Sequence, residues 1–363
     1  MLIAAASGRA LAASARRGGF APLVADRFGD LDTLAAAQKH VLADLARPID
    51  GNRLMAALDT LDDGGGAIGV VCGTGFEDRA DLLTRLAARW PLLGTDPATI
   101  AALKDPIAFA RLCTEAKVPH PQTSLSPPAQ GEGWLVKRMG GAGGWHIRAA
   151  SDGERGEGVY YQRRVAGRAV SALLLGNGAR IMVLGFSEQW TAPTARHPYR
   201  YGGAVRPVAL DAPMRTAMEA AVARLGQRLP LRGLGSADFL AGGEQFQLLE
   251  INPRPGATLD LFEPEAGSLF ALHVAACSGR LPECVPRLDG AMADAIVYAE
   301  RTIAAVPALV WPDWIADRPA PESRIEKDQP LCSVFARADT AEAARRLLAE
   351  RCARVHALMV EVA

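Results

Sequence analysis

The sequence predicts a mixed fold of α/β and α+β parts, in which a doubly wound N-terminal domain precedes a strand-rich domain and a smaller C-terminal region. Strand, helix and strand patterns follow one another within the first 30 residues, and that order is the unit of a parallel sheet. Strand patterns then gather after residue 130, interrupted by one helix pattern, which is typical of an α+β domain. The length of 363 residues fits two or three domains.

Composition excludes several classes of protein. Lys plus Arg and Asp plus Glu number 40 each, whereas a protein that binds nucleic acid by neutralising phosphates normally has a basic excess. No apolar run approaches the roughly 20 residues that cross a bilayer, and the run Met1–Ala6 lacks the basic segment of a signal peptide. We therefore expect a cytoplasmic protein without nucleic-acid or membrane partners. The six cysteines and six histidines have no metal-ligand spacing, so any metal is expected to be held by oxygen ligands.

The first domain is expected over residues 1–95. Its first turn, Ala6-Ser7-Gly8-Arg9-Ala10, lacks the G-x-G-x-x-G pattern, so it is not expected to bind a dinucleotide. The predicted strands are 2–6, 21–26 and 68–72, and the predicted helices end at Arg17 and span 79–89.

The second domain is expected over residues 96–288. Asp96-Pro97 and Asp105-Pro106 each place a capping Asp before a Pro at the first helical position, which predicts two helix starts. Prolines between residues 119 and 128 mark a boundary region. Strands are predicted at 134–137, 158–165, 169–175, 180–186, 234–240 and 246–251, with a helix at 211–229. The last region, 289–363, is predicted to contain strands at 295–299 and 332–336 and a closing helix at 340–352.

A predicted hairpin carries the strongest chemical signal. Two apolar strands flank Gly242-Gly243, and a turn centred on residue 244 places Asp238 opposite Glu250. Side chains two apart on a strand share a face, so Asn252 joins the two carboxylates on one patch. These hard oxygen donors suit Mg²⁺ that keeps several waters and bridges nucleotide phosphates.

A second signal is a strand that ends in Lys137 and runs into a loop with four glycines, Gly140, Gly141, Gly143 and Gly144. Such a loop lets backbone N–H groups close around phosphate oxygens, and the lysine adds a point charge. By itself this pattern is more typical of a flexible turn, because it matches neither the P-loop nor the kinase signature.

Taken together, the two signals resemble the ATP-grasp superfamily over most of the chain. The resemblance implies ATP and Mg²⁺ as cofactors, with Mn²⁺ as a substitute, and it implies four groups of site residues. The phosphate-binding lysine and lid loop would be Lys137 with Gly140, Gly141, Gly143 and Gly144, and the segment that meets adenine would be Gln162, Arg163 and Val165. The metal ligands would be Asp238, Glu250 and Asn252, and the catalytic side chains would be Arg254 and Lys137.

The resemblance also has implications for the domains. Residues 1–95 would be the preATP-grasp domain, a lid subdomain would span about 120–170, and the tail around 318–336 is similar to the C-terminal barrel beside the biotin carboxylase site. Two departures stand out. Lys104 lies two residues from the position where the family has Asp-Lys, and Gln162 and Ala169 replace frequent glutamates. Neither a nucleotide role for Lys104 nor the ribose contacts can therefore be transferred.

The function that the resemblance implies is an ATP-dependent carboxylate–amine ligase that works through an acylphosphate. The similar branch contains biotin-carboxylase-related ligases and tyramine–glutamate ligase, which favours joining an amino acid such as glutamate to a small amine in the biosynthesis of a one-carbon coenzyme. A biotin-carboxylase-like carboxylase and a non-catalytic nucleotide sensor are the alternatives. Family analogy suggests a homodimer. The cluster Arg196, His197, Tyr199, Arg200 and Tyr201 would bind an anionic substrate or form a solvated loop.

Overall fold

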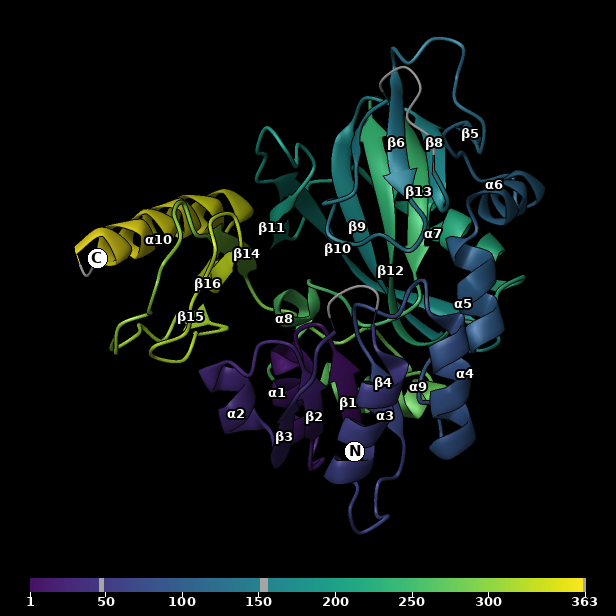
Figure 1. The fold of residues 1–363 in the computed structure, drawn as a ribbon. Helices are drawn as coiled ribbons and strands as arrows, with labels where there is room; N and C mark the ends of the chain where they lie inside the picture. The colour runs from purple at the N-terminus through teal and green to yellow at the C-terminus, as the bar shows by residue number, and fades with distance from the viewer. Residues whose placement is uncertain (46–48, 151–155, 362–363) are drawn as a thin grey trace.

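The N-terminal domain is doubly wound, as the sequence predicts (Figure 1). The computed structural model of the protein describes residues 1–45, 49–150 and 156–361. Four parallel strands lie in the order β3-β2-β1-β4. Helices cover both faces of β1, since Ile3 packs in one apolar cluster with Leu11 of α1 and Leu2 packs in another with Leu54 of α3. The elements are β1 (Leu2–Ala5), α1 (Arg9–Arg17), β2 (Leu23–Asp26), α2 (Leu31–Ala36), β3 (Lys39–Leu42), α3 (Gly51–Leu61), β4 (Val70–Cys72) and α4 (Ala80–Arg89).

An antiparallel sheet of eight strands forms the body of the molecule, in the order β13-β12-β9-β10-β11-β14-β16-β15. The largest apolar cluster lies on one face of this sheet and joins Phe109 of α6, Met218 of α7 and Phe239 of β12. The elements before the C-terminal region are α5 (Pro97–Lys104), α6 (Pro106–Glu115), β9 (Arg168–Asn177), β10 (Ile181–Thr191), β11 (Tyr201–Arg206), α7 (Ala212–Gly226), β12 (Arg232–Gly242), β13 (Gln245–Asn252), α8 (Leu259–Phe262) and α9 (Leu269–Cys277).

A second small sheet projects above this body, in the order β5-β8-β6-β7 (Figure 1). Its strands are β5 (Thr123–Ser124), β6 (Trp134–Arg138), β7 (Arg148–Ala149) and β8 (Val159–Arg163). Its apolar core consists of Val136, Val159 and Tyr161. This sheet lies within the predicted lid segment of about 120–170, of which residues 151–155 lie outside the described residues.

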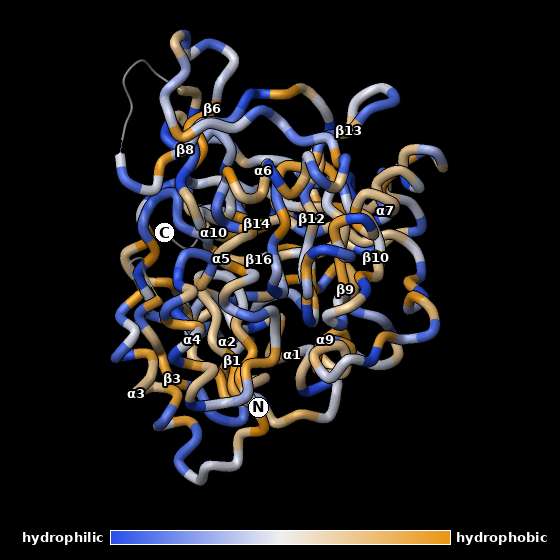
Figure 2. The backbone as a smooth tube through the Cα atoms, turned by 90° about the vertical axis from the view of Figure 1, so that its right-hand side faces the viewer, coloured by the Kyte–Doolittle hydropathy of each residue, from blue (hydrophilic) through white to orange (hydrophobic). Residues whose placement is uncertain are grey.

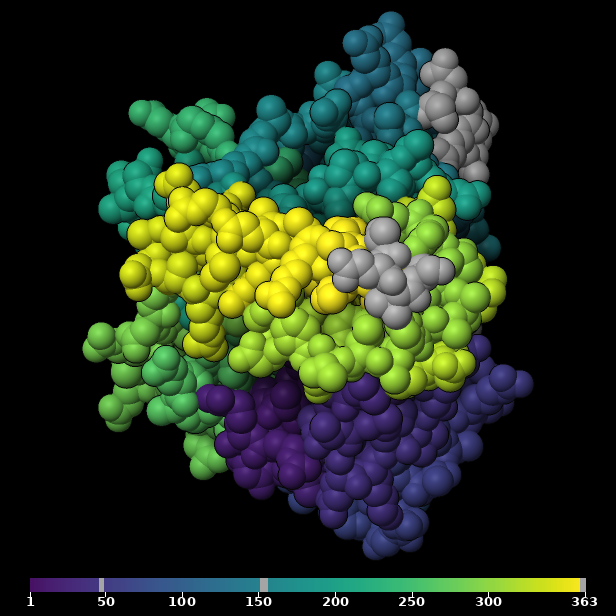
Figure 3. Space-filling view, turned by 90° about the vertical axis from the view of Figure 1, so that its left-hand side faces the viewer, coloured from purple at the N-terminus to yellow at the C-terminus, as the bar shows by residue number. Residues whose placement is uncertain are grey.

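The C-terminal region shares the eight-stranded sheet, because β14 pairs with β11. Its elements are β14 (Ala291–Tyr298), β15 (Ile315–Ala316), β16 (Pro330–Ala338) and α10 (Ala341–Glu361). Side chains of α10 such as Leu348 join the apolar cluster of β14 and β16. Figure 3 shows this region as a yellow layer between the N-terminal domain and the upper part of the molecule. Among the described residues, no helix is long and apolar enough to span a membrane.

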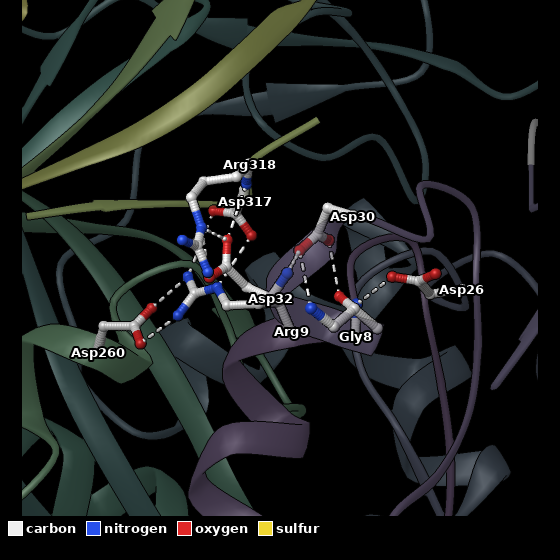
Figure 4. A network of polar contacts seen from close by, with 9 residues as sticks. Gly8, Arg9, Asp26, Asp30, Asp32, Asp260, Asp317 and Arg318 are labelled. Carbon is white, nitrogen blue, oxygen red and sulfur yellow. Dashed lines mark hydrogen bonds and ion pairs between the residues drawn. The ribbon is translucent and has the colours of Figure 1, made fainter. Parts of the chain in front are cut away.

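Apolar residues concentrate in the strands, and hydrophilic residues in the protruding turns (Figure 2). A polar junction joins the three regions where they meet (Figure 4). Arg9 of α1 donates to Asp260 of α8 at 2.6 and 2.7 Å and to Asp317 of the C-terminal region at 2.9 Å. Arg318 donates to Asp32 of α2 at 2.5 Å. These pairs fix the N-terminal domain against the edge of the large sheet.

Candidate active site

The hairpin β12–β13 brings together Asp238 and Glu250, the two carboxylates that are predicted to bind a metal. Gly242 pairs with Gln245 around a two-residue turn, a register that would continue to place Asp238 opposite Leu249. A register shift between Asp238 and Phe239 places Glu250 opposite Asp238 instead. Such a bulge re-aims the side chains that follow it.

The side chains of Asp238, Glu250 and Asn252 form one hydrogen-bonded set. The Asn252 amide donates to Asp238 Oδ2 at 3.0 Å and to Glu250 Oε1 at 3.3 Å. Ser171 Oγ on the neighbouring strand β9 donates to Asp238 Oδ1 at 2.6 Å. One oxygen of Glu250 and the amide oxygen of Asn252 therefore face away from these contacts.

Both of those oxygens accept hydrogen bonds from the ammonium group of Lys104. Its Nζ lies 2.6 Å from Asn252 Oδ1 and 3.3 Å from Glu250 Oε2. Lys104 is the last residue of α5, whose start is fixed by Asp96 accepting from Thr99 N at 2.9 Å with Pro97 in the first turn. The capped helix thus delivers a positive charge to the carboxylate patch.

The surroundings shift the pKa values of the two carboxyl groups in opposite directions. Burial and the negative charge of Glu250 raise the pKa of Asp238. Burial also disfavours the charged form of Glu250, but the nearby Lys104 and Lys137 outweigh it and lower its pKa. Within the described residues, no three His, Cys, Asp or Glu side chains are grouped to hold a metal ion. The set here is two carboxylates and one amide, a combination of oxygen donors that Mg²⁺ accepts when it keeps waters.

Lys137 lies at the end of β6 and is buried. Its Nζ donates to Gln162 Oε1 of β8 at 2.7 Å. Burial lowers the pKa of Lys137, and the charges of Glu250 and Asp238 oppose that shift. The lysine is thus held by the small sheet while its charge acts on the carboxylate patch of the large sheet.

The glycine-rich loop after Lys137 packs against two other segments. A Cβ on Gly140 would lie 2.9 Å from the backbone N of Asp78 in the N-terminal domain, and one on Gly144 would lie 1.9 Å from the carbonyl oxygen of Tyr199. Both glycines have positive φ, at 66° and 72°. Tyr201 N also donates to the carbonyl of Gly143 at 2.9 Å. Glycine is therefore required here for close approach and for backbone conformation.

Four side chains, which we call the loop clasp, fix this loop from the other side: Trp145, His197, Arg200 and Tyr298. The Trp145 and His197 rings lie 4.7 Å apart, and the Arg200 guanidinium lies 3.6 Å from the Tyr298 ring centre. Arg200 is buried and donates to the carbonyls of Ala192 and Asp328 at 2.9 and 3.0 Å. The sequence gives Arg200 two possible roles, binding an anionic substrate or lying in a solvated loop. In the structure its side chain packs against the glycine-rich loop.

The segment expected to meet adenine connects the two sheets. Gln162 and Arg163 end β8, and Val165 lies in the connection from β8 to β9. The Arg163 side chain is exposed, lies 5.8 Å from the Trp134 ring centre and donates to the carbonyl of Glu132. The side chain of Gln162 is buried, whereas that of Arg163 is directed to the surface.

Arg254 follows the hairpin and meets a residue that sequence reasoning missed. Its Nε donates to Glu77 Oε1 at 2.8 Å, and Glu77 comes from the loop after β4 in the N-terminal domain. A cavity of about 20 Å³ between the domains is lined by this pair together with Phe76, Pro253 and His273. The position of Glu77 beyond a parallel strand was a usable signal, because ligand sites in α/β sheets lie at the carboxyl ends of strands. The sequence singles out Lys104 but does not predict its place at the carboxylates.

Residues 104–258 match the sequence model of the family described as the ATP-grasp domain. This part of the chain is an ATP-grasp domain. The match begins at Lys104 and contains Lys137, the glycine-rich loop, the carboxylate hairpin and Arg254. No curated protein sequence matches the chain.

Solved structures extend the likeness of fold to almost the whole chain. The biotin carboxylase from Campylobacter jejuni, solved with a β,γ-ATP complex, aligns with a TM-score of 0.71 at 15% identity, over 94% of this chain and 88% of that one. The biotin carboxylase domain dimer of 2-oxoglutarate carboxylase from Hydrogenobacter thermophilus, solved with MgADP, ADP and bicarbonate, gives 0.72 at 13% identity, over 94% and 87%. Pyruvate carboxylase from Rhizobium etli gives 0.71 at 15%, over 97% of this chain and 39% of that one. At these identities the likeness establishes the fold.

Proposed function

We propose that the protein is a Mg²⁺- and ATP-dependent ligase that activates a carboxylate by phosphoryl transfer and passes it to a nitrogen nucleophile. The observation that carries this proposal is the hydrogen-bonded set of Asp238, Glu250 and Asn252. The last two of these accept hydrogen bonds from Lys104, and the charges of Lys137 and Arg254 act on the set. Phosphoryl transfer needs positioning and charge neutralisation more than a protein nucleophile, and this set supplies both.

The side chains present fit a Mg²⁺–nucleotide. The contact of Lys104 with Glu250 and Asn252 supports this fit, because a positively charged group lies against these oxygens in the folded protein. Asp238, Glu250 and Asn252 would hold the metal, which when bound supplies charge neutralisation of the phosphates. Mn²⁺ would be accepted by the same oxygen ligands.

Each remaining side chain has a proposed task. Lys137 neutralises phosphate charge from the small sheet, and the glycine-rich loop covers the phosphates with its backbone N–H groups. The backbone of Arg163 and Val165, with the Gln162 side chain, lines the adenine end. Arg254 presents its planar guanidinium to oxygens of the γ-phosphate and the substrate carboxylate.

The proposed reaction has two steps. An oxygen of the substrate carboxylate attacks the γ-phosphorus, which gives an acylphosphate and releases ADP. The nitrogen nucleophile then attacks the acyl carbon and loses a proton, and inorganic phosphate leaves with the former carboxylate oxygen. An amino acid such as glutamate and a small amine, joined during the biosynthesis of a one-carbon coenzyme, are the first pair to test.

A second candidate is a carboxylase in which bicarbonate is the carboxylate and biotin supplies the nitrogen. The likeness of fold favours it, because biotin carboxylase from Campylobacter jejuni aligns over 94% of this chain. The 2-oxoglutarate carboxylase domain was solved as a dimer with bicarbonate, which also supports a homodimer here. The two candidates share the activation step and differ in both substrates.

ADP release measured against a panel of amino acids, amines, carboxylates and biotin, with and without bicarbonate, separates the candidates. Mass spectrometry of the products identifies the bond that forms. Turnover that requires an acid and an amine supports the ligase, and turnover that requires bicarbonate and biotin supports the carboxylase. Nucleotide binding without turnover under every condition would refute both and favour a nucleotide sensor. Glu250→Gln is the control for turnover at this site.

A further inference from the structure

Glu77 is a buried carboxylate for which the proposed reaction has no direct use. Its side chain is 1% exposed and lies in the loop that follows β4. The Gly75 backbone N donates to Oε2 at 2.8 Å, while Oε1 accepts from Arg254 Nε at the same distance. Burial disfavours the charged form, but Arg254 and Lys104 outweigh it and lower the pKa of Glu77, so the residue is ionised at neutral pH.

The geometry of the contact fixes the direction of the arginine. Glu77 binds Arg254 through Nε, and within the described residues the terminal Nη groups make no hydrogen bond to the protein. A guanidinium held at Nε presents its two Nη groups as a fork toward other oxygens. Gly256 leaves the space for this fork, since a Cβ there would lie 2.8 Å from Arg254 Nη1.

The negative charge of Glu77 has a second effect on Arg254. The negative charges of Asp238 and Glu250 also attract Arg254. A guanidinium without an anchor would be drawn toward these carboxylates and would cover them. Glu77 offers a competing negative charge on the opposite domain, which keeps Arg254 away from the proposed metal ligands.

We propose that Glu77 is the positioning residue of Arg254, so that the N-terminal domain sets the direction of the catalytic guanidinium. The inference rests on the proposed function, because it assigns to Glu77 a role that is exerted through Arg254. It makes the N-terminal domain a contributor to catalysis as well as a structural support.

The test is a double-mutant cycle on the full-length protein, with kcat measured under the panel conditions that support wild-type turnover. Glu77→Gln is expected to lower kcat by ~10-fold or more, because it removes the charge that anchors Arg254. Arg254→Met is expected to lower kcat by ~100-fold, and the double variant should be no slower than Arg254→Met alone. The Kd of the non-hydrolysable analogue AMPPNP with Mg²⁺, measured by calorimetry, should stay within about threefold in all variants.

Glu263→Gln is the matched control. Glu263 is also an acid between domains, with a side chain 14% exposed, an ion pair to Arg17 at 3.4 Å and a hydrogen bond from Ser14 at 2.8 Å. Its kcat should remain at the wild-type value. Should Glu77→Gln fail to fold, Glu77→Asp keeps the charge, withdraws it by one methylene and serves in the same cycle.

Two results would overturn the inference alone: an additive cycle, in which the Glu77 variant slows Arg254→Met by the factor seen in wild type, or a lowered melting temperature with wild-type kcat. A wild-type protein that binds Mg²⁺–AMPPNP but shows no carboxylate-dependent turnover would refute the proposed function, and the role of Glu77 with it.

Discussion

Asp294 is the buried acid for which the structure gives the largest pH effect on stability. It lies on β14 with 7% of its surface exposed and accepts a hydrogen bond from Ala204 N at 2.9 Å. Burial raises the pKa of Asp294 to about 8, with the negative charge of Asp260 adding to the shift and Arg9 opposing it. Asp294→Asn is the perturbation, because the amide keeps the size and the accepting oxygen of the side chain and cannot ionise.

The sign of the effect follows from proton linkage. Between the ordinary aspartate pKa of about 3.9 and the raised value, the folded state holds a proton on Asp294 that the unfolded chain has released. The wild type therefore loses stability as pH rises through this window, and above about pH 8 the loss of stability is complete. One pKa unit corresponds to about 1.4 kcal/mol, so the stability gap between the variant and wild type should widen by up to about 2.7 kcal/mol from pH 5 to pH 7.

Thermal unfolding of both proteins at pH 5, 6, 7 and 8 measures this gap. We expect Asp294→Asn to melt higher than wild type at pH 7 and the difference to grow by at least about 3 °C from pH 5. Asp289→Asn is the control for the substitution itself, because it removes a carboxylate whose side chain is 56% exposed. A gap for Asp294→Asn that is flat, or that narrows as pH rises, would refute the reasoning.

Three further predictions concern the site. Glu250→Gln keeps the size of the side chain but removes a charge that balances Mg²⁺, so kcat for ADP release should fall at least ~100-fold; wild-type turnover would contradict the metal assignment. Arg254→Met should leave ATP affinity within a few-fold and lower kcat by ~100-fold, since contacts that strengthen in the transition state act on kcat; a lower melting temperature with retained kcat would identify a turn residue instead. Trp145→Ala removes the central ring of the loop clasp, so the glycine-rich loop should open and steady-state kinetics should give a several-fold higher KM for ATP; an unchanged KM would mean that the clasp has no part in nucleotide binding.

The sequence predicted the local part of the site because its signals are local. Two apolar strands on either side of Gly242-Gly243 predict the hairpin, and the pairing of Asp238 with Glu250 is confirmed. The path to that pairing differs from the expected one, since the bulge at Leu249, rather than a symmetrical turn, produces it. Both helix starts with Asp before Pro are also confirmed, because capping depends on neighbouring residues only.

Contacts between distant segments could not be predicted from local patterns. Lys104 reaches Glu250 across 146 positions within the second domain, and Glu77 of the N-terminal domain reaches Arg254 across 177. Both contacts depend on how distant segments pack in the folded chain. The sequence pattern does not predict β3, whose sequence Lys-His-Val-Leu lies at the edge of its sheet and carries two exposed residues. Such an edge strand lacks the continuous apolar run that identified β1. The domain boundaries and the roles of the site residues stay predictions.

The most direct test of the proposed activation step follows an oxygen atom. A carboxylate substrate found in the panel is labelled with ¹⁸O, and the released inorganic phosphate is analysed by ³¹P NMR. If the carboxylate attacks the γ-phosphorus at the site of Asp238, Glu250 and Arg254, each phosphate will carry one ¹⁸O from the substrate. Phosphate that takes its new oxygen from water alone would mean that water is the nucleophile, and it would contradict the account.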